Sequence, residues 1–286
     1  MKKILLIAVV LLLVGFAFLY MFQNGRLGTP SGNMPSNNSK TFTKKDCDVM
    51  GKDEHGVQRL LECVTSMSDD FEHGIQLTTA QWHKIINQTS NGQQGSKDNG
   101  IQTSAEHAHA GKYSLKTVTA QDKGDLQKSA LARELLFFPP GSDFWYSAWY
   151  YIPGGTNTGN LYIFELESTA YHYVGRRLTF TGPGGNLLYV EAKKDTGDKF
   201  YQSDSATSFP KDRWVHLKLH IHLSSDADGV VELWQNGKQI IEGHGQNMPP
   251  NQFYDWIAVG QTANASHEAQ TVYIDDVMIS GQPIKD

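Results

Sequence analysis

The residues best suited to catalysis are two neighbouring glutamates and, shortly after them, a Tyr-His-Tyr run. Glu165 and Glu167 stand two apart in the stretch FELES, so on a strand both carboxyl groups point to the same side. Their spacing of roughly 6 to 7 Å along a strand is compatible with the two-carboxylate geometry of glycoside hydrolysis. Tyr171, His172 and Tyr173 follow at once, and side chains of these types can move protons near neutral pH.

A second candidate is the histidine series in WVHLKLHIH. His216, His220 and His222 share one face of the expected strand, and the apolar residues between them share the other. His220 and His222 could hold zinc or copper, but a third ligand would have to come from a neighbouring strand, and the sequence nominates none. We therefore favour a polar strand face in water over a metal site.

A third candidate is the aromatic stretch FWYSAWYYI. Alternation places Trp145, Trp149 and Tyr151 on one face and Tyr146 and Tyr150 on the other. One set must enter the core, while the other can stack on sugar rings in a groove, with polar neighbours contacting the hydroxyl groups. The carbohydrate-binding candidates are Trp145, Trp149, Tyr150, Tyr151, Glu165, Glu191 and Lys193.

The elements that must position these residues are short strands. From Asp69 to the end, alternating runs are bounded by Gly, Pro, Asn and Asp, which is typical of one antiparallel β-sandwich over 69–286. The turn after the histidine strand leads to a returning strand, in which Asn236-Gly237 predicts a tight hairpin. The fold class is therefore all-β.

The N-terminus predicts export. Lys2 and Lys3 precede an apolar run from Ile4 to Phe22 that is long enough to cross a bilayer core of roughly 30 Å as a helix. We expect residues 1–22 to be a transmembrane anchor, with a cleaved signal segment as the alternative. Residues 23–45, rich in Gly, Pro, Ser and Asn, read as a flexible linker. The domain is then a single-pass membrane protein on the extracytoplasmic side.

The two cysteines fit that location. Cys47 and Cys63 are the only ones in the chain, and in an oxidising compartment they predict one disulfide closing a short loop. Within this 46–68 segment, the spacing of GVQRLLECV over 56–64 predicts a short helix. The formal net charge of -5 argues against nucleic acid as a partner.

The order of several motifs resembles a known superfamily. WVHLKL, an acidic turn, GVVELWQNGK and the closing VYIDDVMIS are similar to the concanavalin A-like lectin/glucanase superfamily, which includes laminin G-like jelly rolls. Upstream, LARELLFFPPGSDFWYSAWYYIP and LYIFELES resemble the jelly-roll polysaccharide lyases of the alginate and heparin type. The resemblance implies a jelly-roll β-sandwich and a saccharide ligand.

The resemblance also implies roles. A lyase of this kind must neutralise a uronate carboxylate, remove the adjacent proton and protonate the leaving oxygen. Arg133 stands where the family has its Arg-Glu strand, but Glu165 and Glu167 occupy the strand where the family supplies Gln and His. Two carboxylates would repel a uronate, so Tyr171, His172 and Tyr173 are the loop candidates for the base.

A structural calcium ion is a further expectation from the resemblance. In many saccharide-binding jelly rolls an early Glu and a late Asp hold Ca²⁺, and Glu72 with Asp275 or Asp276 are the matching residues here. The alternative is that these acids only cap strand ends.

Three functions remain open at this point. A membrane-tethered polysaccharide-binding protein is the leading interpretation. The alternative is a polysaccharide lyase that cleaves uronate-containing glycans by β-elimination, and a glycoside hydrolase is the third choice.

Overall fold

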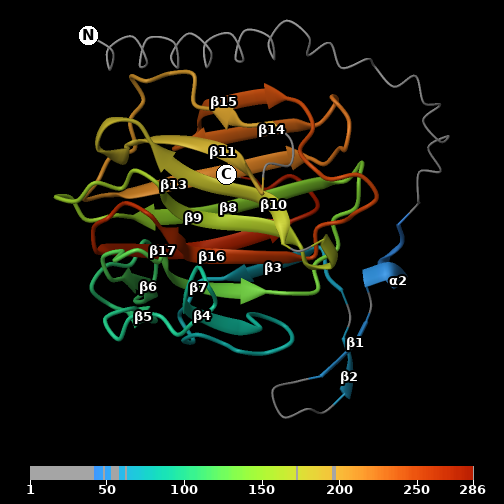
Figure 1. Ribbon diagram of the computed structural model, residues 1–286, viewed down its shortest axis with the longest axis horizontal. Helices are drawn as coiled ribbons and strands as arrows, with labels where there is room; N and C mark the ends of the chain where they lie inside the picture. Colours follow the sequence, from blue (N-terminus) through green and yellow to red (C-terminus); the bar gives the residue numbers. More distant parts are fainter. Residues whose placement is uncertain are drawn as a thin grey trace, which may run out of the picture. The chain divides into compact units, whose positions relative to one another are not determined.

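Two antiparallel sheets form the core of the protein. The computed structural model describes residues 42–47, 49–52, 58–61, 63–171, 173–194 and 198–285. One sheet has seven strands in the order β12-β11-β10-β9-β16-β7-β4, and the other has the order β15-β14-β13-β8-β17-β6-β5, with β3 also pairing with β17. In Figure 1 β14 and β15 lie at one side of the domain, and β4, β5 and β6 lie at the opposite side. The predicted β-sandwich is confirmed.

The strands of the seven-stranded sheet position the candidate site. They are β4 (Lys84–Thr89), β7 (Gln127–Arg133), β9 (Leu161–Ser168), β10 (Val174–Thr181), β11 (Leu187–Lys193), β12 (Phe200–Tyr201) and β16 (Trp256–Asn264). The second sheet contains β3 (Ser66–Asp69), β5 (Gly100–Ser104), β6 (Ser114–Thr119), β8 (Asp143–Tyr151), β13 (Trp214–His222), β14 (Val230–Gln235), β15 (Lys238–His244) and β17 (Gln270–Ser280).

Strict alternation builds β13. Leu217, Leu219 and Ile221 are buried in the core, and the residues between them are partly exposed. Burial of these three side chains fixes the register of β13, because a one-residue slip would expose all of them to water. The predicted outward face of this strand is confirmed.

The hairpin between β14 and β15 also follows the sequence. Asn236 and Gly237 both have positive φ, 50° and 78°. A two-residue turn of this type requires that conformation, which Asn and Gly adopt at low cost.

The segment before the sandwich is only partly as expected. Cys47 and Cys63 form the predicted disulfide. The helix expected over 56–64 is wrong, because Gln58–Leu61 (β2) is a strand paired with Val49–Lys52 (β1). A short apolar run such as RLL suits either structure, and the disulfide ties the two ends of this loop together, which favours a hairpin. A single turn, α2 (Lys44–Cys47), precedes β1.

The expected anchor over 1–22 and most of the linker over 23–45 lie outside the described residues. Within the ranges that the structure describes, no helix is long and apolar enough to cross a membrane.

Candidate functional site

A row of charged residues crosses the outer face of the seven-stranded sheet. Glu165 on β9 is the cross-strand partner of Arg177 on β10, and Arg177 is the partner of Glu191 on β11. Cross-strand partners point to the same side of a sheet. Their neighbours along the strands, Leu166 and Leu178, belong to the core, so the charged residues point away from it.

A second row lies one pleat further along. Glu167 on β9 faces Gly175 on β10, which in turn faces Lys193 on β11. A Cβ at Gly175 would collide with the backbone carbonyl oxygen of Leu166, so the position between Glu167 and Lys193 carries no side chain. Lys193 Nζ reaches across it, contacting Glu167 and lying 3.2 Å from Glu165 Oε2. We call Glu165, Glu167, Arg177, Glu191 and Lys193 the charged cluster.

Two tyrosines complete one end of the charged cluster. Arg177 pairs with Glu191 and lies 4.4 Å from the centroid of the Tyr162 ring. Tyr189 donates its hydroxyl to Glu191 Oε2 at 3.0 Å. Burial, and after it the charge of Glu191, raises the pKa of Tyr189, so this phenol keeps its proton at neutral pH.

Apolar residues, three of them alanines, lie on the other side of the charged cluster. Ile86, Ala130, Ala132, Ala258 and Trp256 form a hydrophobic cluster separate from the main core. Ala132 pairs with Ala258, and Ala258 pairs with Glu165, so this apolar strip continues the charged row across the sheet. A charged region beside a flat apolar strip suits a ligand with both polar groups and apolar ring faces.

The surroundings push the pKa values of the two central carboxyl groups apart. Burial, followed by the charge of Glu165, raises the pKa of Glu167 well above its ordinary value. Burial opposes ionisation of Glu165 too, but the charges of Lys193 and Lys128 outweigh it and hold the pKa of Glu165 below its usual range. Glu167 therefore keeps its proton to a higher pH than Glu165 does.

Three buried polar atoms at this site have no hydrogen-bond partner among the residues that the structure describes. They are Glu167 Oε2, Arg177 Nε and Trp256 Nε1. Trp256 is the cross-strand partner of Glu167, so two of the three come from adjacent positions. A buried polar atom without a partner costs free energy, and a ligand that supplied the missing bonds would recover it.

The loop that follows β9 brings one tyrosine to this face. The Tyr173 ring packs edge-on against Trp256, with the centroids 5.8 Å apart, and is 41% exposed. Burial, and then the charges of Glu134 and Glu167, raises the pKa of Tyr173. Tyr171 ends the short helix η1 (Thr169–Tyr171), and His172 lies outside the described residues.

Arg133 does not join the site. It pairs with Ile257, which belongs to the core, so its side chain leaves β7 on the opposite side from Ala132. Arg133 is 1% exposed and donates from Nη1 to the carbonyl oxygens of Thr79 and Gln81, each at 2.7 Å. These bonds make it an anchor for the 79–81 loop.

The predicted carbohydrate-binding set is split between three environments. Glu165, Glu191 and Lys193 belong to the charged cluster, whereas Tyr150 is buried in the core with its hydroxyl 2.6 Å from that of Tyr146. Trp145, Trp149 and Tyr151 lie on the outer face of the eight-stranded sheet. Alternation defines which residues share a face, but it does not place two strands of different sheets on the same side of the molecule.

Histidine rings cover the aromatic residues on that second face. The rings of His220 and Trp145 stack with centroids 4.1 Å apart, and those of His109 and Trp149 stack at 3.7 Å. His107 stacks on Tyr151 at 4.0 Å. A ring face that already contacts a histidine is not free to stack on a sugar, so one face of each of these three rings is occupied within the protein.

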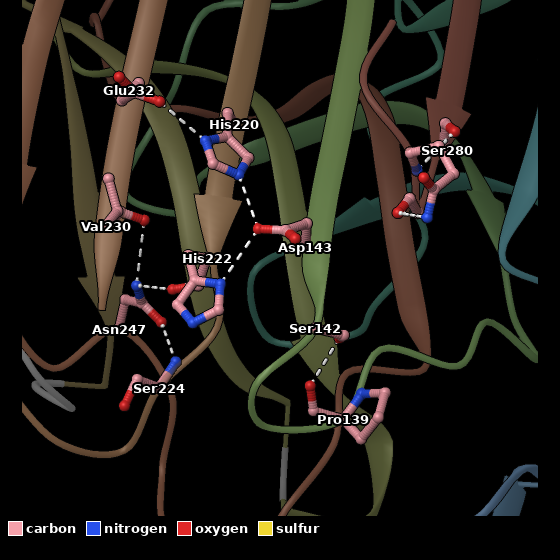
Figure 2. A network of polar contacts seen from close by, with 12 residues as sticks. Pro139, Ser142, Asp143, His220, His222, Ser224, Val230, Glu232, Asn247 and Ser280 are labelled. Carbon is pink, nitrogen blue, oxygen red and sulfur yellow. Dashed lines mark hydrogen bonds and ion pairs between the residues drawn. The ribbon is translucent and has the colours of Figure 1, made fainter. Parts of the chain in front are cut away.

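The histidines of β13 are held by carboxylates. Figure 2 shows His220 between Glu232 and Asp143, with Nδ1 at 2.8 Å and Nε2 at 2.9 Å from them, and His222 Nδ1 3.1 Å from the same Asp143 oxygen. Both ring nitrogens of His220 are therefore occupied. Across the ranges that the structure describes, no group of three or more His, Cys, Asp or Glu side chains is arranged to hold a metal.

The acids considered for calcium hold a loop. Glu72 Oε1 accepts bonds from the backbone N–H of Lys112 and Tyr113, both at 2.7 Å. Asp275 Oδ2 accepts the backbone N–H of His109 at 2.8 Å, and Asp276 lies 2.7 Å from the His109 ring. Burial, and after it the charge of Asp276, raises the pKa of Asp275 to about 6.

Several residues of this face were not among the sequence candidates: Tyr162, Arg177, Tyr189 and Trp256. The signal for Arg177 was present, because it alternates with the core residues of RRLTF on the side opposite to them. Its place beside Glu165 depends on strand pairing, which a single sequence does not reveal.

Comparison with solved structures supports the fold. An endo-β-1,4-glucuronan lyase from the fungus Trichoderma reesei superposes with a TM-score of 0.57 at 13% identity, covering 70% of this chain and 90% of that one. Cip1, a cellulose-induced protein, superposes with a TM-score of 0.55 at 18% identity, covering 77% and 99%. At these identities the likeness shows the fold alone.

Comparison with curated proteins finds no match. The model of one protein family, described as polysaccharide lyase, matches residues 71–278, which span nearly the whole sandwich. The resemblance in the sequence motifs is thereby confirmed, and the chain belongs to the polysaccharide lyase family.

Proposed function

We propose that this protein binds a uronate-containing polysaccharide across the outer face of its seven-stranded sheet and cleaves it by β-elimination. Family membership supports the reaction class. The glucuronan lyase with the same fold is named for a polyuronate, which supports the substrate class. The observation that carries the proposal is the buried Glu167, whose raised pKa favours its protonated form, beside the buried Arg177 Nε and Trp256 Nε1, which have no hydrogen-bond partner among the described residues.

A neutral Glu167 removes the objection that the sequence raised. A protonated carboxylic acid has the shape of a glutamine side chain and donates one hydrogen bond, so it can bind a uronate carboxylate that an ionised Glu would repel. Lys193 and Arg177 lie beside it and add positive charge. Together they withdraw charge from the bound carboxylate, which makes the proton on the adjacent carbon easier to remove.

The elimination removes one proton, breaks one carbon–oxygen bond and returns one proton. A base takes the proton from the carbon next to the carboxylate, and that electron pair forms a carbon–carbon double bond. The bond to the glycosidic oxygen breaks, and an acid donates a proton to the leaving oxygen. The products are one chain with an unsaturated uronate and one with a new hydroxyl end.

Residues after β9 supply the proton transfers in this proposal. The raised pKa of Tyr173 keeps its phenol protonated, which suits the acid. His172 is assigned as the base by residue type, because histidine is neutral and basic near neutral pH.

Binding without cleavage is the second candidate. The raised pKa values of Tyr162 and Tyr189 favour it, since tyrosines that hold their protons are poor bases. Hydrolysis, the third choice, would need one of the two central carboxyl groups to act on a water.

One assay separates these functions. Acidic and neutral polysaccharides are incubated with the protein, and ultraviolet absorbance of unsaturated uronate, new reducing ends and gel retardation are measured. A lyase gives the absorbance, a hydrolase gives reducing ends without it, and a binder gives retardation alone. His172→Ala should abolish the absorbance and keep the retardation. Retardation without absorbance on every uronate polymer would refute the lyase assignment.

We also propose that the domain is tethered outside the membrane by Ile4 to Phe22. The Cys47–Cys63 disulfide supports an oxidising compartment. Protease added to spheroplasts should digest the domain, and a protected domain would contradict this location.

Calcium remains a proposal for Glu72, Asp275 and Asp276. Their oxygen atoms suit a hard cation, although Glu72 and Asp275 already accept backbone N–H groups. If the ion binds, Ca²⁺ should raise the melting temperature of chelator-treated protein, and Asp275→Asn should remove that response. An unchanged melting temperature would leave these acids as loop anchors.

A further inference from the structure

An exposed tyrosine lies at the edge of the same face as the charged cluster. Tyr201 on β12 is the cross-strand partner of Tyr189, which is two residues from Glu191 on β11. Tyr189 and Glu191 share the outer face by alternation, and the cross-strand partner of Tyr189 shares it too. Tyr201 therefore extends this face to the last strand of the sheet.

The two rings form a backed platform. The Tyr201 and Tyr189 rings stack with centroids 5.0 Å apart and an angle of 16° between planes. Tyr189 is buried and is fixed by its bond to Glu191, whereas Tyr201 is 58% exposed. The inner ring thus holds the outer one in a set orientation, and most of the outer ring faces solvent.

Within the described ranges, the exposed aromatic residues lie on this face. Among the described residues, the exposed large hydrophobic side chains are Leu77, Ile85, Tyr173, Tyr201 and Met278. The two aromatic ones, Tyr173 and Tyr201, lie at opposite ends of the charged cluster. Tyrosine combines an apolar ring with a hydroxyl, so an ordered, exposed ring suits the apolar face of a sugar.

The position of Tyr201 separates it from the reacting unit. From β9, which carries Glu165 and Glu167, to β12 there are three strand spacings, or roughly 14 Å. One sugar unit cannot contact both places. A ligand that contacts both must be a chain that runs across the strands.

We propose that Tyr201, backed by Tyr189, is a stacking subsite for a sugar unit distant from the Glu165/Glu167 pair. This inference rests on the proposed function, because it assigns the same polysaccharide to both places. The subsite makes the protein selective for chain length. A chain that reaches Tyr201 gains the stacking contact, and a shorter oligosaccharide bound at the carboxyl pair does not.

Three variants test the subsite: Tyr201→Ala, Tyr201→Phe and Met278→Ala. The Phe variant keeps the ring and loses only the hydroxyl. Met278, 41% exposed on the other sheet, is the matched control for removing an exposed apolar side chain. All three should fold, which melting temperatures check.

The readouts are binding and cleavage of a long uronate polymer and of its di- and trisaccharides. Tyr201→Ala should weaken polymer binding and raise KM by roughly three- to tenfold, the worth of one aromatic contact, with kcat unchanged. Short oligosaccharides should not respond, and the Phe and Met278 variants should behave as wild type. An equal loss for short and long ligands, or no loss at all, would overturn the subsite while leaving the proposed function intact. Wild type that neither binds nor cleaves any polymer would instead refute the proposed function, and the subsite with it.

Discussion

Glu167 and Trp256 are cross-strand partners on β9 and β16, and each buries a polar atom, Oε2 and Nε1, that no group in the described part of the chain satisfies. Unpaired buried atoms are uncommon in folded proteins. Two at neighbouring positions, on the face that also holds the charged cluster, indicate a place prepared for an outside partner.

The first prediction concerns pH and Glu167. Because its pKa is raised, Glu167 keeps its proton to a higher pH than an ordinary glutamate and ionises as the pH rises through its own pKa. Ionisation removes the donor and adds a charge that repels uronate, so wild-type affinity should fall on the alkaline side. Glu167→Gln should keep affinity at neutral pH and lose this alkaline decline.

Dissociation constants for an acidic polysaccharide, measured against pH for both proteins, check this. Glu167→Asp is the control, because it keeps a titrating group on a shorter side chain. Identical pH profiles for wild type and Glu167→Gln would show that Glu167 does not act as a neutral donor.

The second prediction concerns Lys193. Its ammonium group contacts both central carboxyl groups, and its side chain is 17% exposed. Lys193→Met removes the ammonium group that contacts both buried carboxyl groups and should cost up to about 3 to 5 kcal/mol of unfolding free energy, the charges of Lys128 and Arg177 remaining near Glu165. Lys193→Met with Glu165→Gln should recover part of that loss, since the remaining Glu167 has a raised pKa and takes up a proton more readily than Glu165 does. Urea unfolding of both single variants and the double variant measures the coupling, and strictly additive losses would contradict it.

The third prediction concerns Asp275. Its folded-state pKa of about 6 is above its ordinary 3.8, so the protonated form favours the folded state. Its stabilising contribution is complete below the ordinary value and is lost as the pH rises through about 6. Wild type should therefore lose stability relative to Asp275→Asn between these two values.

Melting temperatures in the presence of chelator give the comparison. His109 and Asp276, which face Asp275, are present in both proteins and largely cancel in the difference. A difference that does not change with pH would show that Asp275 is ionised throughout.

The fourth prediction concerns the disulfide. Cys47 and Cys63 are 16 positions apart, and closing a loop of this size contributes roughly 2 to 4 kcal/mol. Replacing both by Ser should lower the melting temperature and leave the β-sheet circular dichroism unchanged. Loss of the sheet signal would show that the 47–63 segment is required for the sandwich to fold.

Periodicity predicted the strands well and the site only in part. Leu217, Leu219 and Ile221 are buried as the alternation of β13 requires, and Glu165 and Glu167 do share a face. These are local properties, because a strand of known phase has only two faces. Alternation along a single strand is therefore enough to predict which of its residues share a face.

The missed features depend on pairing between strands. Arg177 becomes a site residue because β10 lies between β9 and β11, and Trp145 is removed from the site because β8 is in the other sheet. The protonation of Glu167 depends on burial and on the nearby charge of Glu165. None of these relationships is encoded at a fixed separation along the chain.

The positions of the tryptophans allow ligand binding to be followed by intrinsic fluorescence. All six lie within the described ranges: Trp82 is in the core, and Trp145, Trp149, Trp214 and Trp234 belong to strands of the eight-stranded sheet. Trp256 alone borders the charged cluster. A change in intrinsic fluorescence on adding a polysaccharide that Trp256→Phe abolishes would therefore locate the ligand on this face without any label.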